Sequence, residues 1–237
     1  VEAGVNPFVS IINKDGNYKN SIKFGGSENA TPIAIATDKD DHIYVAGNFY
    51  NVFFVVGKDT LYNKGNSDGF VIKLDKNLNI LWVIPIASQY KDVLNDINVD
   101  SEGNIYVAGL TTTKYSYPDN TYETFLIKLS PESNVLWEKR GVTNSKAYTK
   151  SILIDQEDNC YWVSLGDSIN FNDDHPINSS TDTNGGFIIK YSPDSEWLNS
   201  IILSPIIGAH LDEQNLYIVE TVKHDSTFGI NTIKYNL

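Results

Sequence analysis

Tyrosine residues provide the best candidate binding chemistry in this sequence. A tyrosine presents a flat apolar ring and a hydroxyl group, which suit both sugar rings and protein surfaces. Residues 48–69 are rich in aromatic residues and residues 110–124 carry tyrosines among threonines, and these tyrosines do not recur with the other patterns of the chain. The candidate binding residues of this kind are Tyr50, Tyr62, Tyr115, Tyr117 and Tyr122. They predict recognition of a protein or a glycan; the alternative is that they are solvated or pack within their own loops.

Acidic residues and histidines offer a second chemistry, the coordination of a cation. Asp173, Asp174 and His175 lie together in one loop and are further candidate binding residues, and Asp38 begins a turn that reads DKDDH. Carboxylate oxygens are ligands that Ca²⁺ prefers. The equivalent turns read DSEGN and DQEDN, however, and share no common set of oxygen ligands. We therefore expect hairpin turns and no cofactor, with Ca²⁺ as the open alternative.

Groups that could react chemically are scarce. The sequence has no Ser–His–Asp arrangement, phosphate-binding glycine loop or zinc-ligand spacing. Cys160 occupies a position that is Ile43 or Ile105 in other repeats, which predicts a small core residue rather than a nucleophile. His210 falls in a predicted inner strand, where it could line a central channel, and it completes the set of candidate binding residues.

The chain of 237 residues is acidic, with a formal net charge of −12. A negative protein repels the phosphates of nucleic acids and of anionic membrane surfaces, so neither is an expected partner. The longest apolar run, residues 200–209, is interrupted by Ser204 and Pro205 and is too short to span a bilayer, so no membrane insertion is expected. The start at Val1 suggests a processed product or an excised piece.

Two sequence patterns recur along the chain. The first joins two alternating apolar runs through an acidic turn that a tyrosine follows, at residues 35–47, 97–109, 152–165 and 209–220. The second is an apolar run followed by a polar turn, beginning at Phe8, Gly69, Thr124, Gly186 and Asn231. Repeats at such intervals are typical of propeller blades. The blade-like repeats cover about residues 8–23, 33–84, 95–138, 150–200 and 207–237.

Alternation of apolar and polar residues with period two predicts strands, and no stretch predicts a helix. One repeat supplies four short antiparallel strands, for example residues 97–99, 104–109, 125–129 and 134–137. A sheet with two apolar faces cannot stand alone, and packing several sheets around an axis buries both faces. The sequence therefore predicts an all-β fold, a single β-propeller domain of four-stranded antiparallel blades. We expect four blades closed into a ring by both ends of the chain; the alternatives are five blades or part of a larger propeller.

The repeat resembles the bacterial β-propeller repeat family called SBBP and, more distantly, PQQ-type blades. The resemblance rests on DSEGNIYVAG at residues 100–109 and on FVIKLDKNLNILW at residues 70–82. These motifs are specific for blade architecture and say little about activity. The usual setting of the family implies a bacterial protein that is secreted, periplasmic or on the cell surface.

The connections between second and third strands vary most, and in a propeller they collect on one rim. Residues 51–70 align without a gap with residues 168–187, which matches Val52 to Ile169 and Phe54 to Phe171. This regularity predicts an extra hairpin in alternate repeats, with Phe54 and Phe171 packed in the core.

These observations predict a secreted or surface-exposed binding or scaffold propeller that recognises a protein or glycan through one loop-rich face. The first alternative is a propeller hydrolase or lyase that acts on a sugar or lactone at the central channel. The second is a purely structural module of a larger surface protein. A fold alone does not decide among them.

Overall fold

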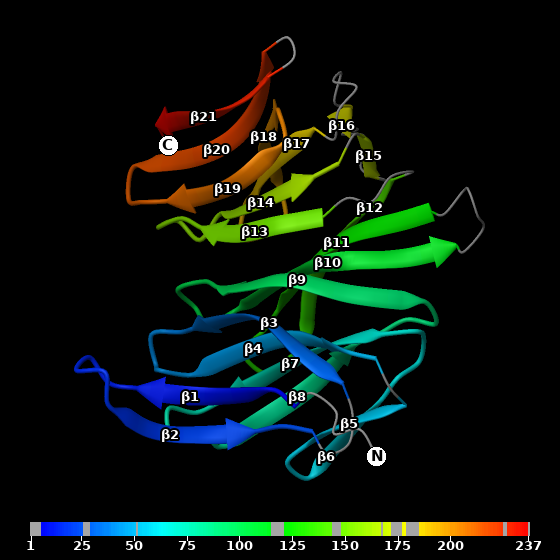
Figure 1. Cartoon of the computed structure of the whole chain (residues 1–237), viewed down its shortest axis with the longest axis vertical. Helices are drawn as coiled ribbons and strands as arrows, with labels where there is room; N and C mark the ends of the chain where they lie inside the picture. Colours follow the sequence, from blue (N-terminus) through cyan, green and yellow to red (C-terminus); the bar gives the residue numbers. More distant parts are fainter. Residues whose placement is uncertain are drawn as a thin grey trace.

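The computed structural model describes residues 6–25, 29–50, 52–114, 121–143, 148–166, 168–171, 177–178, 185–224 and 227–236. Its described regular structure consists of antiparallel strands, in a two-stranded sheet inserted within the second blade and in five successive sheets that follow one another along the chain. We number these sheets blade 1 to blade 5 in chain order. Figure 1 shows them one above another along the long axis of the molecule.

The blades are built from consecutive strands. Blade 1 contains β1 (Phe8–Ile12) and β2 (Tyr18–Lys23). Blade 2 has the order β3 (Ala30–Thr37), β4 (Ile43–Phe49), β7 (Asp68–Leu74) and β8 (Ile80–Ile86). Blade 3 has the order β9 (Lys91–Val99), β10 (Ile105–Lys114), β11 (Thr121–Leu129) and β12 (Val135–Thr143). Blade 4 has the order β13 (Tyr148–Ile154), β14 (Cys160–Leu165), β17 (Gly186–Tyr191) and β18 (Trp197–Leu203). Blade 5 has the order β19 (Ile206–Leu211), β20 (Asn215–His224) and β21 (Thr227–Asn236).

The predicted all-β architecture of four-stranded antiparallel blades is confirmed. The first strands of blades 2 to 5, namely β3, β9, β13 and β19, follow one another as neighbours, with β9 in contact with both β3 and β13, and β13 with β19. This is the arrangement expected of inner strands in a propeller.

Apolar side chains fill the space between consecutive blades. Tyr44 and Ala46 of blade 2 pack with Phe125 and Leu129 of blade 3, and all four side chains are fully buried. Three further clusters join blades 1 and 2, blades 3 and 4, and blades 4 and 5. Successive strand residues point to opposite faces, so each inner blade contributes to two clusters at once. Cys160 is fully buried in one of them, as its repeat position predicts, and burial raises the pKa of its thiol well above the ordinary value.

The turn between the first two strands of a blade is set by an aspartate and by one residue in the left-handed backbone region. In blade 3, Asp100 accepts a hydrogen bond from the backbone N–H of Asn104, and Gly103 has φ 83°. Asp41 and Asp158 take the glycine position in blades 2 and 4, with φ 63° and 62°. Aspartate tolerates this region better than most residues, which explains why the D-x-x-G-N turn survives the replacement of its glycine.

The predicted extra hairpins are present in blades 2 and 4. They are β5 (Phe53–Val56) with β6 (Asp59–Tyr62), and β15 (Ser168–Phe171) with β16 (Ile177–Asn178). Phe54 and Phe171 are each only 2% exposed, which confirms their predicted packing role. Val52 and Ile169, which align in the sequence, have different surroundings, because Val52 is 75% exposed whereas Ile169 is 1% exposed.

Each inserted hairpin packs against the outer strand of the preceding blade. Strand β15 pairs with β12 of blade 3 at Gly141, where a Cβ atom would overlap the side chains of Ile169 and Phe171. In the same way, the backbone N–H of Gly25, just after β2, donates to the carbonyl oxygen of Val55 at 2.7 Å. The hairpins therefore fasten blade 2 to blade 1 and blade 4 to blade 3.

Two expectations from the sequence are corrected. Blade 1 and strand β21 lie at opposite ends of the long axis (Figure 1), so the described strands form an open arc and the four-blade ring closed by both chain ends is not seen. The connection predicted at residues 110–124 is also shorter, because β10 continues to Lys114 and β11 begins at Thr121. Packing between residues that are far apart in the sequence decides both features, and a local sequence pattern does not predict such packing.

Candidate functional site

The structure separates the candidate residues. Tyr50 and Tyr62 are 44% and 67% exposed and lie beside or within the β5–β6 hairpin. Tyr122, expected in a loop, lies in β11 and is only 9% exposed, so its ring belongs to the packed part of blade 3. His210 lies on inner strand β19, exposed and opposite Tyr217. The remaining candidates lie outside the described residues: Tyr115, Tyr117, Asp173, Asp174 and His175.

The β5–β6 hairpin has one buried and one exposed face. Phe54, Val56 and Leu61 point inward and are between 0% and 8% exposed. Phe53 and Tyr62 are direct cross-strand partners on the other face and are 38% and 67% exposed. Residues directly opposite in an antiparallel pair have side chains close enough to touch, so these two rings form one outward surface.

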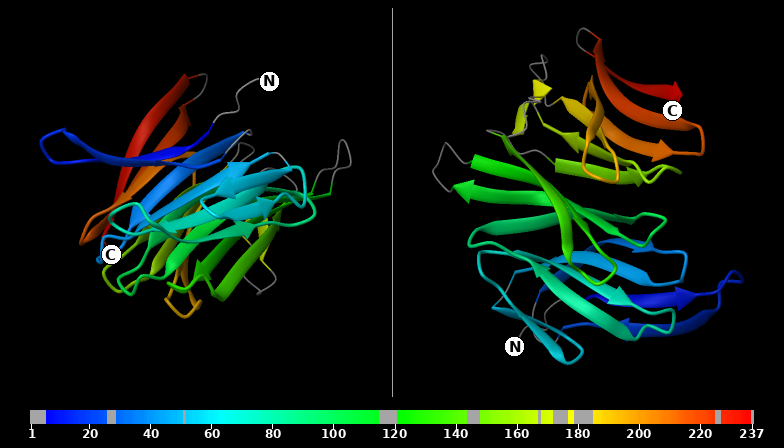
Figure 2. Two further views of the ribbon diagram at one scale, coloured as in Figure 1. Left: turned by 90° about the horizontal axis from the view of Figure 1, so that it is seen from below. Right: turned by 180° about the vertical axis from the view of Figure 1, so that it is seen from behind.

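Neighbouring residues extend this surface. Val52 precedes β5 and is 75% exposed, and Tyr50 follows the end of β4. We call Tyr50, Val52, Phe53 and Tyr62 the hairpin patch. Figure 1 and the right-hand view of Figure 2 show the β5–β6 hairpin projecting from the end of blade 2. Sequence reasoning selected the two tyrosines but not Val52 or Phe53, whose exposure depends on which face of the hairpin turns inward.

A polar box recurs at the opposite end of the blades, where first and second strands meet. In blade 4, Asp155 accepts hydrogen bonds from Asn159 and from the Tyr161 hydroxyl, and forms an ion pair with Lys190 at 3.0 Å. The ammonium group of Lys190 also lies 4.8 Å from the centre of the Tyr161 ring. Blade 3 builds the same box from Asp100, Asn104, Tyr106 and Lys128. The recurring tyrosines thus belong to the blade, as their period predicts.

Proline carbonyls link these boxes from one blade to the next. Pro131 of blade 3 accepts hydrogen bonds from Lys73 Nζ at 3.3 Å and from Trp82 Nε1 at 3.0 Å, both in blade 2. Pro193 of blade 4 does the same for Lys128 and Trp137 of blade 3. The turn between third and fourth strands is therefore a structural contact between blades.

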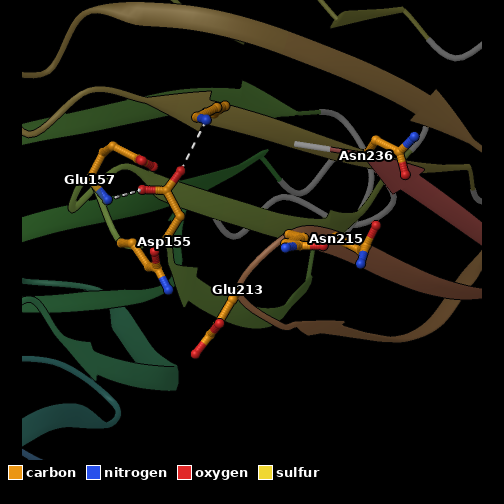
Figure 3. A pocket seen from close by; sticks show the side chains of 8 residues that line it. Asp155, Glu157, Glu213, Asn215 and Asn236 are labelled. Atoms are coloured by element: carbon orange, nitrogen blue, oxygen red, sulfur yellow. Dashed lines mark hydrogen bonds and ion pairs between the residues drawn. The ribbon is translucent and has the colours of Figure 1, made fainter.

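A hollow of about 510 Å³ lies between blades 4 and 5 at this edge. Figure 3 shows Asp155 and Glu157 of blade 4 on one side of it, and Glu213, Asn215 and Asn236 of blade 5 on the other. At the equivalent place between earlier blades, Pro131 or Pro193 lies against the preceding lysine. Among the described residues, no proline turn of blade 5 lies against Lys190 in this way.

The charged side chains of Asp155 and Lys190, which line this hollow, form contacts with each other and with neighbouring side chains. Burial alone would raise the pKa of Asp155, but hydrogen bonds from Asn159 and Lys190 outweigh it and lower the pKa below the ordinary value. Burial alone would lower the pKa of Lys190, and its contacts with Tyr161 and Asp155 raise it instead. The charged groups of the box are therefore paired with one another and stabilise the fold, and none of them is arranged as a catalytic acid or base.

The pKa of Asp155 predicts how one box responds to acid. A carboxyl group whose pKa is lowered by folding contributes stability above its unfolded pKa of about 4, and that stability is lost as the pH falls through the folded pKa. We expect Asp155→Asn to lower the free energy of unfolding by about 1–2 kcal/mol at neutral pH. The difference from the wild type should shrink below about pH 4 in urea unfolding. Asp194→Asn, in an exposed turn, is the control, and a difference that persists undiminished in acid would contradict the assignment.

Metal coordination has one candidate among the described residues, the group Asp38, Asp40 and His42. Both oxygens of Asp38 are already used by the turn. Oδ1 accepts from the backbone N–H groups of Asp40 and His42, and Oδ2 from the Tyr44 hydroxyl, with His42 Nδ1 at 2.8 Å. The turn explains these residues without an ion.

Asp68 is a buried acid that sequence reasoning did not single out. It starts β7, is fully buried, and accepts a hydrogen bond from the backbone N–H of Lys64 through Oδ2 at 2.7 Å. Its Oδ1 has no hydrogen-bond partner within the described structure. Burial, with a further contribution from the nearby charge of Asp92, raises its pKa. Asp92 is itself held by Thr111 and Ser88, so both acids brace loops on the rim that also carries the β5–β6 hairpin.

Comparisons with known proteins agree with the architecture. Residues 86–115 match the family model of the SBBP β-propeller repeat. An uncharacterized WD repeat-containing protein of Acanthamoeba polyphaga mimivirus is 24% identical, over 63% of this chain and 13% of its own length. This chain therefore spans a small part of that relative.

Solved structures that match include two variants of the Synechocystis apocarotenoid oxygenase. One has a TM-score of 0.49 at 7% identity and covers 96% of this chain and 55% of the oxygenase chain. The other has a TM-score of 0.46 at 8% identity and covers 89% of this chain and 50% of the oxygenase chain.

Within the described residues, no helix has the length and hydropathy needed to cross a membrane. The stacked four-stranded blades show a β-propeller fold, and the stretch that matches the SBBP repeat, residues 86–115, lies within blades 2 and 3.

Proposed function

We propose that this propeller is a binding module that recognises a partner through the hairpin patch. The observation that carries the proposal is the pair Phe53 and Tyr62, two exposed rings side by side on a hairpin whose other face is firmly packed. The fold of the hairpin does not require aromatic residues at these two positions. In the related hairpin of blade 4, the residue before the buried Phe171 is the exposed Asn170 rather than an aromatic residue.

The chemistry of the patch favours a protein or a glycan as the partner. Flat rings with a hydroxyl group bind sugar rings and apolar protein surfaces, and they lose little conformational freedom when they bind. The formal net charge of −12 disfavours nucleic acids. An extracellular, periplasmic or cell-surface location is part of this proposal and is supported by the usual setting of SBBP repeats.

The alternative of a hydrolase or lyase at the central channel has less support. His210 is the candidate on an inner strand, and it lies opposite Tyr217 rather than among carboxylates. The group of Asp38, Asp40 and His42 lies at a turn, where hydrogen bonds already occupy Asp38. The alternative of a structural module predicts that no partner depends on the hairpin patch, so one experiment tests both proposals.

The test is a binding screen on matched variants. The wild type is applied to a glycan array and to a displayed peptide library, which separate the two partner classes. We expect the double variant Phe53→Ser and Tyr62→Ser to weaken any selected interaction about tenfold or more, since aromatic residues dominate binding hot spots. Phe8→Ser with Tyr18→Ser removes two exposed rings elsewhere and should leave binding unchanged. Equal binding by the wild type and the hairpin variant would remove the basis of the proposal.

A further inference from the structure

Two buried acids lie side by side where blade 2 meets blade 3. Asp68 begins β7 of blade 2 and is fully buried, and Asp92 lies near the start of β9 of blade 3 and is 3% exposed. The residues before them, Ser67 and Lys91, pair as a parallel bridge, and the backbone N–H of Asp92 donates to the Ser67 carbonyl oxygen at 2.8 Å. Burial, and then the nearby charge of Asp92, raises the pKa of Asp68. The two carboxyl groups therefore share one buried place between the blades.

No cationic side chain pairs with these two acids in the described part of the chain. Neither Asp68 nor Asp92 forms an ion pair with a lysine, arginine or histidine there. The charge of Lys64 favours the ionised form of Asp68, but the contact between them is a hydrogen bond from the Lys64 backbone N–H. A carboxylate taken out of water without a counter-charge is strongly unfavourable. Either a proton or a cation from outside the chain therefore balances this pair.

One oxygen of Asp68 is also without a partner. Its Oδ2 accepts the hydrogen bond from Lys64 at 2.7 Å, whereas Oδ1 is buried and has no hydrogen-bond partner among the described residues. Buried polar atoms are nearly always paired, so an unpaired carboxylate oxygen indicates a bound ligand or water. On Asp92, Oδ2 accepts from Ser88 and Oδ1 accepts from the Thr111 hydroxyl at 2.6 Å, which leaves Oδ1 a second lone pair. The pair thus offers oxygen atoms from both acids to one ligand.

Blade 3 shows how the same position is balanced elsewhere in the chain. Glu123 of β11 holds the position of Asp68 in the repeat, and Nη1 of Arg140 lies 3.3 Å from Oε2 of this glutamate. Arg140 lies in outer strand β12, and the matching residue of outer strand β8 is Pro85, which carries no charge. Blade 2 therefore keeps the acid of this position but lacks the cationic partner that blade 3 supplies.

We propose that Asp68 and Asp92 bind one Ca²⁺ ion, which joins blade 2 to blade 3. Ca²⁺ takes carboxylate and carbonyl oxygens in a flexible geometry, which suits two acids on neighbouring backbone segments. Mg²⁺ usually keeps several of its waters, and a buried site is a poor place for them. Asp38, Asp40 and His42 are the described group with three titratable ligands, but there the turn already uses both oxygens of Asp38.

The test compares thermal unfolding of the wild type and of Asp68→Asn, in EDTA and in about 5 mM CaCl₂, a concentration that fills sites as weak as those of extracellular modules. We expect Ca²⁺ to raise the melting temperature of the wild type by about 5 °C or more and to leave Asp68→Asn unchanged. In EDTA the variant should be at least as stable as the wild type, because it removes an uncompensated buried charge. Calorimetric titration of the wild type should give one Ca²⁺ site per chain, and Asp92→Asn should remove it as well.

Asp40→Asn is the matched control, because it changes an acid of the other candidate group and should keep the wild-type shift. A wild type with the same melting temperature in Ca²⁺ and in EDTA would show that a proton neutralises Asp68, and would overturn the inference. A shift that persists in Asp68→Asn would place the ion elsewhere, and an equal shift with Mg²⁺ would assign it to screening of the net charge of −12. The double variant Phe53→Ser and Tyr62→Ser keeps both acids and should show the full shift, so this result is independent of the fate of the hairpin patch.

Discussion

Replacing Trp162 with alanine should lower the free energy of unfolding by about 3–5 kcal/mol. Trp162 lies in β14, is fully buried, and packs at right angles to Phe171 and Phe187, with centroid distances of 5.7 and 6.3 Å. Its indole N–H donates to Thr149 Oγ1 at 2.9 Å, so truncation also leaves a buried hydroxyl group without its donor. The side chain lies in the cluster that joins blades 3 and 4, and its loss leaves a cavity between them.

Urea unfolding monitored by far-UV circular dichroism measures this effect. Leu81→Ala is the matched control, because Leu81 is 49% exposed on the outer strand of blade 2 and should change stability by less than about 0.5 kcal/mol. Equal effects of the two substitutions would mean that the space between blades 3 and 4 is not a packed core.

The second large effect is expected from Lys128→Met. Lys128 Nζ lies 3.1 Å from Asp100 Oδ2, and their side chains are 5% and 1% exposed. It also donates to the Pro193 carbonyl oxygen at 3.2 Å, across the boundary between blades 3 and 4, and lies over the Tyr106 ring. Removing one partner of a buried ion pair leaves an uncompensated charge, so we expect a loss of about 3–5 kcal/mol.

Blade 5 provides the matched control for this substitution. Lys234 occupies the same register position and lies 5.6 Å from the centre of the Tyr217 ring, but it is exposed. Lys234→Met should therefore cost less than about 1 kcal/mol. Combining Lys128→Met with Asp100→Asn removes both charges and should recover part of the stability. Equal losses at Lys128 and Lys234 would show that burial of the pair is not what stabilises blade 3.

The sequence predicted the blade because the blade is a local structure. Period-two alternation in IYVAG and FLIKL sets the strands, and the aspartate of DSEGN sets the turn through hydrogen bonds no more than four residues apart. Cys160 was identified as a core residue because its position is apolar in the other repeats, and Phe171 because it aligns with Phe54 in the two repeats that carry the extra hairpin. The polar box was visible only as recurring tyrosines and lysines, because its contacts between blades span about fifty residues or more.

Features that depend on contacts between blades were not predictable in this way. Tyr122 looks like a loop residue, yet β10 continues five residues beyond Gly109 and β11 begins at Thr121, so Tyr122 lies in a strand and is buried. Val52 and Ile169 align in sequence, but their two hairpins have different strand registers, and only Ile169 is covered. Ring closure depends on the angle between successive sheets, which the sequence pattern does not specify. The hairpin patch was half predicted, through Tyr50 and Tyr62.

The central claim is that successive small sheets stack face to face into an open arc. Spin labels at Lys19→Cys on β2 and Asn236→Cys on β21, diluted with unlabelled protein, test it by pulsed electron resonance, since Cys160 is fully buried and shielded from the label. Sheets packed about 10 Å apart place blades 1 and 5 roughly 40 Å apart along the arc, so the structure predicts a distance well beyond about 20 Å. A distance distribution near the spacing of paired strands, about 5 Å between backbones before the label arms, would show that blade 1 and β21 pair to close a ring.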